Sequence, residues 1–226
     1  MNKQVVIIQT DAEVPAGVIA EFLAAWQVPF SILRPDLGDT IPTVAASVIV
    51  LGGRMGVHDE MLHPFLRPLK DSLRRMLANR TPLLGICLGG QLLADIAGGV
   101  VSSNRCGEKG LVEITLTAAG AADPLFAGLG QCFRAFQWHN DSFTIPPQAA
   151  FLAGSATCPG QAFRIGNAWG LQFHPEVDGS IVSAWSERFP AKEPLLTEFV
   201  AAEPEHRMLA RQLFGNFLEF AGVRAS

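Results

Sequence analysis

A cysteine stands at the sharpest turn that the sequence predicts. The stretch Gly85-Ile86-Cys87-Leu88-Gly89 follows an apolar run and precedes a helix-like segment, which is the nucleophile-elbow pattern with cysteine in place of serine. Glycines two positions either side leave room for a strained turn, and the positive end of the following helix favours the thiolate of Cys87. The Leu88 amide is placed to donate to an oxyanion. The alternative is a buried, unreactive cysteine in a glycine-rich turn.

A histidine and a glutamate follow at a spacing that suits an activating pair. A short strand ends at His174, Pro175 stiffens the turn, and Glu176 follows. A carboxylate two residues after the histidine can return across the bend, fix the tautomer of the imidazole and stabilise the imidazolium. Taken alone, this pattern is better explained by a surface histidine before a proline turn. Together with Cys87 it predicts a nucleophile–base–acid triad.

Two further segments have residues that could line the same pocket. Gly52 and Gly53 directly follow a predicted strand, and the Gly53 amide is the candidate for a second oxyanion donor. The alternative for these glycines is an ordinary strand-ending turn. The polar segment 138–143 also ends a strand. In it His139 is either a second titrating group or, as is more common, a structural residue hydrogen-bonded to a neighbour such as Asp141.

Alternating strand-like and helix-like segments must position these residues. In the first half, strand-length apolar runs alternate with segments of helical periodicity, which predicts parallel strands covered on both faces. Short strand candidates without long helices between them predict an antiparallel extension in the second half. The expected fold is α/β, a three-layer, open, mostly parallel (flavodoxin-like) sheet with helices on both faces and that extension. The expected strands are 5–9, 30–33, 46–51, 82–86, 111–116, 132–137, 150–153 and 161–165, and the expected helices are 15–26, 61–77, 90–97 and one or two from about 193 to 220.

Composition narrows the functional classes. The 226 residues, 49% hydrophobic and 17% charged, suit one α/β domain over 1–226, with a core at about 4–185 and a helical tail at 190–226. A net charge of -4 without a Lys/Arg block argues against nucleic-acid binding, and no apolar stretch approaches the roughly 18 residues that span a bilayer. Four widely spaced cysteines and no export signal predict a reduced, cytoplasmic protein. The histidines form no metal-ligand motif, so neither a metal site nor a cofactor is expected.

The two main motifs resemble those of a known family. The run 82–94 is similar to the nucleophile signature of class I glutamine amidotransferases, and 172–176 is similar to their histidine–glutamate signature. The order and the intervals also agree over about residues 4–185. The resemblance implies that Cys87 attacks the side-chain amide of glutamine, that His174 takes the thiol proton and then protonates the departing ammonia, and that Glu176 orients His174. A γ-glutamyl thioester would form, and water would release glutamate.

The resemblance also implies a glutamine pocket. The Leu88 and Gly53 amides would form the oxyanion hole, and Gln91 would contact the amino-acid end of the substrate. The segment 138–143 resembles the family's His-Gly-Asp segment, which lines this pocket. The candidate substrate-binding residues in it are His139, Asp141, Ser142 and Phe143.

The sequence departs from the family pattern in two places near this pocket. Asn140 stands where the His-Gly-Asp segment has glycine. After the elbow helix, Glu108-Lys109-Gly110-Leu111 stands where relatives tend to have Glu-Ile-Gly-Trp. Losing that aromatic residue is expected to widen or depolarise part of the pocket.

The resemblance leaves the fate of the ammonia open. Most members work with a synthetase, but no segment here reads as a synthetase phosphate loop, so the chain resembles the free-standing branch, similar to the glutaminase domain of GMP synthase without its partner. The leading hypothesis is therefore a glutamine amidotransferase that passes ammonia to a synthetase or other acceptor. A stand-alone γ-glutamyl amide or peptide hydrolase would use the same triad. The third hypothesis is a catalytically silent regulatory or thiol-sensing protein, although a sensor has no need of His174 and Glu176.

Overall fold

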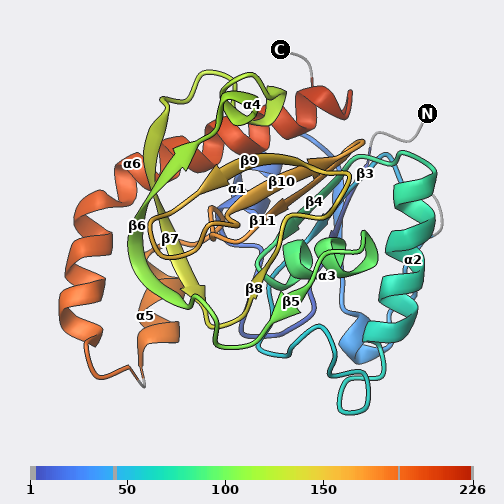
Figure 1. Cartoon of the computed structure of the whole chain (residues 1–226), viewed down its shortest axis with the longest axis horizontal. Helices are drawn as coiled ribbons and strands as arrows, with labels where there is room; N and C mark the ends of the chain where they lie inside the picture. Colours follow the sequence, from blue (N-terminus) through green and yellow to red (C-terminus); the bar gives the residue numbers. More distant parts are fainter. Residues whose placement is uncertain (1–3, 43–44, 188, 225–226) are drawn as a thin grey trace.

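The computed structural model describes residues 4–42, 45–187 and 189–224, and its main feature is a nine-stranded sheet in the order β2-β1-β3-β4-β11-β10-β9-β6-β7. Neighbours from β2 to β11 pair in parallel, and those from β11 to β7 pair antiparallel (Figure 1). This confirms the predicted fold class. The strands are β1 (Val5–Ile8), β2 (Phe30–Leu33), β3 (Ser47–Val50), β4 (Leu83–Ile86), β6 (Glu108–Leu116), β7 (Cys132–His139), β9 (Ala150–Gly154), β10 (Ala162–Ile165) and β11 (Ala168–Leu171), while β5 (Val101–Ser102) and β8 (Ser142–Phe143) form a separate two-stranded sheet.

Helices cover both faces of the sheet because its parallel strands are apolar on both sides. Along β1, Val5 and Ile7 pack into one core cluster with α1 and α6, whereas Val6 and Ile8 pack into another with α2 and α3. Figure 1 shows α3 in front of the sheet and α1 behind it. The helices are α1 (Val18–Ala25), α2 (Leu66–Ala78), α3 (Leu88–Ile96), α4 (Ala118–Ala121), α5 (Gly179–Ser186) and α6 (Lys192–Phe220), with 3-10 turns η1 (Pro35–Leu37) and η2 (Pro124–Phe126).

The helices differ from the prediction mainly at α2 and α5. Helix α2 begins at Leu66 rather than at Met61, because Pro64 disfavours a helical conformation at the residue before it, and Met61 is 86% exposed. The tail from Lys192 is one 29-residue helix that continues through Pro204, in agreement with the one or two helices expected from about 193 to 220. Helix α5, which the sequence analysis did not predict, is capped by the Asp178 side chain, whose carboxylate accepts from the Ile181 amide.

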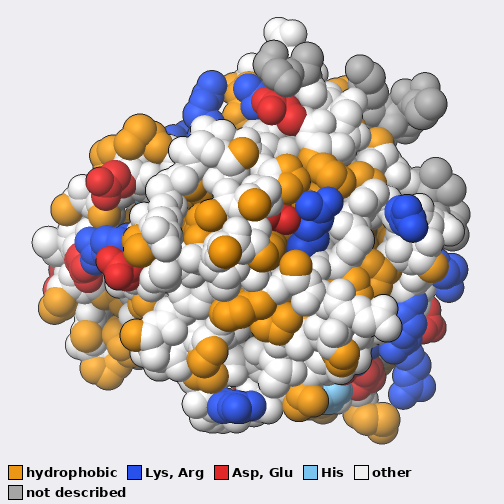
Figure 2. Space-filling view, turned by 45° about the horizontal axis from the view of Figure 1, so that its top comes forward, with side chains coloured by type: hydrophobic (Ala, Val, Ile, Leu, Met, Phe, Trp, Pro, Cys, Tyr) orange, Lys and Arg blue, Asp and Glu red, His pale blue; other side chains and the backbone are white. Residues whose placement is uncertain are grey.

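The helices and the surface charges can be compared with the expectations of no membrane span and no nucleic-acid binding. Among the described residues, no helix combines the length and the apolar character needed to cross a membrane. On the face drawn in Figure 2, basic side chains gather along the right-hand edge with a few acidic ones beside them, and elsewhere charged side chains of both signs are interspersed with apolar ones.

Three strand ends meet at one edge of the sheet and prepare the site. Strand β4 lies between β3 and β11, parallel to both, with Gly85 opposite Gly170 and Ile86 opposite Leu171. The segments that follow β3, β4 and β11 therefore leave the sheet side by side. In open α/β sheets this carboxyl edge is where ligands bind.

Candidate active site

The turn after β4 has the strained geometry that the glycines predict. Cys87 has φ 50° and ψ −108°, lies at the N-terminus of α3 and is 7% exposed. A side chain at Gly85 would overlap the carbonyl of Gly89, and one at Gly89 would overlap the carbonyl of Val50. Only glycine allows helix α3 to approach β3 and β4 this closely, so the two glycines hold the cysteine at the edge of the sheet.

His174 and Glu176 form a buried pair beside the cysteine. The Nδ1 of His174 lies 2.7 Å from Glu176 Oε1, and the two residues are 2% and 0% exposed. The backbone of each is held by another element: the His174 amide donates to Phe136 O at 2.8 Å, and the Val18 amide donates to Glu176 O at 3.0 Å. The indole of Trp185 lies edge-on to the imidazole at 4.9 Å between ring centres. The ring of His174 is thus fixed from several sides.

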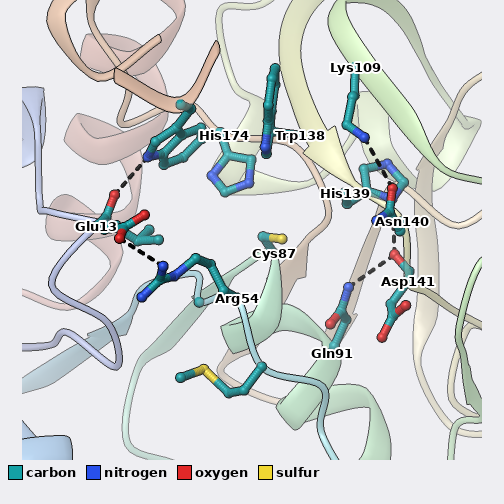
Figure 3. Close-up of a pocket in the computed structure, with 14 residues that line it drawn as sticks. Glu13, Arg54, Cys87, Gln91, Lys109, Trp138, His139, Asn140, Asp141 and His174 are labelled. Carbon is teal, nitrogen blue, oxygen red and sulfur yellow. Dashed lines mark hydrogen bonds and ion pairs between the residues drawn. The ribbon is translucent and has the colours of Figure 1, made fainter. Parts of the chain in front are cut away.

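The imidazole of His174 faces Cys87, and its surroundings favour the protonated ring. Figure 3 shows the two side chains beside one another in the cavity. A side-chain carbon at Gly52 would lie 3.1 Å from His174 Cε1 and 3.5 Å from Cys87 Cβ, so the backbone of Gly52 borders both groups. Burial alone would lower the pKa of His174, but the charges of Glu176 and Cys87 outweigh it and raise this pKa to about 10. Among the described residues, His174 Nε2 has no hydrogen-bond partner, which leaves it available to the thiol and to a leaving group.

The two candidate oxyanion donors lie next to each other. A side-chain carbon at Gly53 would lie 2.5 Å from Met55 Sδ, 2.7 Å from Thr10 Oγ1 and 2.8 Å from Leu88 Cδ2, so a larger residue there would displace neighbouring side chains. Gly53 lines the cavity, and Leu88 is the first residue of α3, where backbone amides have no helical partner. The two residues thus lie near each other at the ends of β3 and β4, and the assignment of their amides as the oxyanion hole stays a prediction.

The cysteine opens into a cavity of about 300 Å³. It collects most of the predicted residues, whereas Glu176 lies behind His174, and Leu88, Ser142 and Phe143 are buried and do not line it. Ser142 Oγ lies 3.2 Å from Cys106 Sγ, and Phe143 packs edge-on against Phe163. The lining residues are Glu13, Val14, Gly53, Arg54, Met55, Cys87, Gln91, Lys109, Trp138, His139, Asn140, Asp141, His174 and Trp185.

Gln91 and His139 support one loop of this cavity. Gln91 Nε2 donates to the Asp141 carbonyl at 3.1 Å and to Gln172 Oε1 at 3.3 Å. The Nδ1 of His139 lies 2.9 Å from the same carbonyl, which can only accept, so this nitrogen carries the hydrogen. These contacts agree with the structural interpretation of His139 and add a positioning role for Gln91.

Behind the loop lies a buried polar cluster that residue spacing did not reveal. Glu108, His139 and Cys158 place one ligand-type atom each within 4.8 Å of one another. Both oxygens of Glu108 are already engaged, one by Ser155 Oγ at 2.6 Å and the other by Gln161 Nε2 at 2.5 Å. Burial, Cys106 and Glu108 raise the pKa of Cys158 to about 12, so the thiol keeps its proton. We therefore describe the cluster as a hydrogen-bonded support for His139 and assign it no metal.

Several lining residues had not been predicted from the sequence. Arg54 crosses one wall and pairs with Asp11 at 2.8 Å and with Glu13 at 2.7 Å. Trp185 reaches the same wall, where its Nε1 donates to Glu13 O at 2.6 Å. Arg54 follows Gly53 directly and could have been found from that neighbour. Trp185 and Glu13 have no signal in the sequence because they come from an unpredicted helix and from the loop after β1.

Comparisons with known proteins show the family of this chain. Residues 18–183 match the model of the glutamine amidotransferase class-I family. A glutamine amidotransferase-like protein (YfeJ) of Salmonella typhimurium is 38% identical over 150 residues, 63% of each chain. A glutamine-hydrolysing GMP synthase subunit of Pyrococcus abyssi is 41% identical over 99 residues, 42% of this chain and 51% of that one. The chain thus spans about half to two thirds of the length of these relatives.

Solved structures match over almost the whole chain. A glutamine amidotransferase from Thermotoga maritima superposes with a TM-score of 0.89 at 27% identity, covering 97% of this chain and 99% of that one. One from Methylobacillus flagellatus gives 0.87 at 27% identity, covering 97% and 95%. The family model and the fold agree, and this chain belongs to the class I glutamine amidotransferase family.

Proposed function

We propose that the protein is a cysteine-dependent glutamine amidotransferase that hydrolyses the side-chain amide of glutamine. Cys87 Sγ attacks the amide carbon while His174 takes the thiol proton, and the amides of Gly53 and Leu88 bind the resulting oxyanion. When the intermediate collapses, the C–N bond breaks and His174 protonates the departing nitrogen, which leaves as ammonia. Water then attacks the γ-glutamyl thioester, again with His174 as base, and releases glutamate and the free thiol.

The observation that carries this proposal is the buried His174–Glu176 pair beside an elbow cysteine. A carboxylate 2.7 Å from Nδ1 stabilises the imidazolium that forms when the ring removes the thiol proton. A cysteine with a purely structural role does not require such a pair. Burying the Glu176 carboxylate costs desolvation free energy, which favours a catalytic role for the pair. The silent-sensor hypothesis therefore has the least support from the geometry.

We further propose that the ammonia passes to a separate synthetase. The likeness to a glutamine-hydrolysing GMP synthase subunit supports glutamine as substrate and a separate synthetase as partner. The stand-alone hydrolase of γ-glutamyl amides or peptides uses the same residues and differs only in its leaving group.

The test is the release of ammonia and glutamate by the purified protein, offered L-glutamine and then γ-glutamyl amines, with Cys87→Ala as the blank. Cys87-dependent hydrolysis of glutamine is the expected result. Activity on a γ-glutamyl amine alone would replace the proposal with the hydrolase. If both substrates stay intact, the assay is repeated in the presence of the synthetase component of a GMP synthase, and silence there too would refute the proposed function.

A further inference from the structure

A substrate bound for this reaction must extend toward one particular wall of the cavity. Its amide carbon lies at Cys87, its oxygen at Gly53 and Leu88, and its leaving nitrogen at His174. In Figure 3, Glu13 and Arg54 lie on the same side of Cys87 as His174, whereas Gln91, Asp141 and Lys109 lie on the opposite side. The amino-acid end of the substrate is therefore directed toward the wall that carries Lys109.

Besides His174, which is paired with Glu176, two positively charged side chains line the cavity, and they differ in whether a carboxylate neutralises them. Arg54 is paired with Asp11 and Glu13, both within 2.8 Å. Lys109 makes no ion pair with a carboxylate anywhere in the described part of the chain. Its neighbour Glu108 points to the other face of β6, into the buried cluster, because successive side chains of a strand alternate. Of these two side chains, Lys109 is therefore the one whose charge is available to bind an anionic ligand.

Lys109 is also held in place at the rim. The register of β6 and β7 sets it opposite Trp138, and its Nζ lies over the Trp138 ring at 5.5 Å and over the Phe189 ring at 5.6 Å. The Nζ also donates to Asn140 Oδ1 at 3.3 Å. An ammonium group has three donors, so this contact leaves donors for a ligand. Lys109 and Asn140, the two departures in the sequence noted above, thus form one unit at the mouth of the cavity.

We infer that Lys109 is a specificity-determining residue whose ammonium group binds the α-carboxylate of the γ-glutamyl substrate. This inference rests on the proposed function for the placement of the substrate. The site would accordingly select free glutamine or another γ-glutamyl compound with a free α-carboxylate, and would discriminate against glutamine whose α-carboxyl is amidated or joined in a peptide bond.

The test compares L-glutamine with L-glutamine α-amide, which lacks the α-carboxylate. Lys109→Met keeps the length of the side chain and removes the charge, Lys109→Arg keeps the charge, and Arg74→Met on α2 removes a charge outside the cavity. Lys109→Met should lower kcat/KM for L-glutamine about five- to tenfold, mainly through KM, and leave the value for the α-amide within about twofold. Lys109→Arg should restore most of the preference, and Arg74→Met should behave as the parent.

A binding measurement separates this inference from the proposed function. Calorimetry with L-glutamine and its α-amide is run on Cys87→Ala and on Cys87→Ala/Lys109→Met, so that no turnover is needed. Selective loss of L-glutamine affinity in the double variant supports the role of Lys109 even if the purified protein hydrolyses nothing. Equal losses for the two ligands, unchanged affinity for L-glutamine, or no binding of L-glutamine by Cys87→Ala would each overturn it.

Discussion

Replacing Glu176 by glutamine tests the triad at its most buried member. The change keeps the shape of the side chain and removes a charge that is wholly inaccessible and lies 2.7 Å from His174 Nδ1. Glu176 Oε2 has no hydrogen-bond partner among the described residues, so the new amide would also place an unpartnered donor there. The imidazolium would lose its only paired carboxylate in the described part of the chain.

The size of the effect follows from the pKa of His174. Its rise from 6.5 to about 10 corresponds to roughly 5 kcal/mol in favour of the protonated ring. This value already includes the opposing effect of burial, which lowers the pKa, and both Glu176 and Cys87 contribute to the rise. Glu176 is the largest of the contributions that raise this pKa, so the loss of its charge should lower kcat/KM by about 10²–10³. His174→Ala should cost more, because it removes the base itself.

Two assays measure this loss. The first is kcat/KM for L-glutamine from pH 6 to 10, with Glu205→Gln, an exposed position on α6, as the charge-matched control. The second is the rate of Cys87 alkylation by iodoacetamide over the same range, which needs no turnover. In Glu176→Gln the onset of alkylation should move to higher pH, because the imidazolium that stabilises the thiolate is weakened. Wild-type kcat/KM together with an unchanged alkylation profile would refute the assignment of Glu176.

Other consequences can be measured separately. Cys87→Ala should abolish hydrolysis and leave the melting temperature within a few degrees, and retained turnover would disprove the mechanism. In the NMR spectrum of the labelled protein, the His174 ring should titrate near pH 10 instead of 6.5, so its contribution to stability is complete below about pH 6.5 and is lost as the pH rises toward 10; a midpoint near 6.5 would contradict this. Gly89→Ala should destabilise the fold by about 1–3 kcal/mol or more in urea denaturation, because the new methyl would overlap the Val50 carbonyl, whereas Gly130→Ala, whose nearest atom would be 3.4 Å away, should change little.

Much of the site is local in the chain, and for that reason it could be predicted from the sequence. The elbow depends on small residues within two positions of Cys87 and on a helix that begins at once, and the structure has both. The contact between His174 and Glu176 spans a single bend, so the spacing of the two residues sets it. The alternation of apolar strands and amphipathic helices likewise predicted the layers of the fold.

The sequence did not predict features that depend on contacts between distant segments of the chain. Ser142 and Phe143 stand in the segment that follows β7, yet they form strand β8 of the small sheet, and their side chains contact Cys106 and Phe163 rather than the cavity. Trp185 reaches His174 from a helix that has no strong periodic signal. The cluster around Glu108 joins residues from two strands and a loop, and no spacing within the sequence could disclose it.

The sequence by itself determined which residues could react and which turns hold them, because steric fit and hydrogen bonding across a few residues are settled locally. Only the tertiary structure decided that these residues meet. Strand β11 could have paired elsewhere, and it lies parallel to β4 because that arrangement buries Trp169 and Leu171 in the core beneath α6 and α1. The carboxyl ends of β4 and β11 then coincide and bring Cys87 to His174, while the pairing of β6 with β7 brings Lys109 to the mouth of the same cavity. Strand pairings of this kind depend on the total apolar area that the whole chain buries, and no single segment of the sequence determines that total.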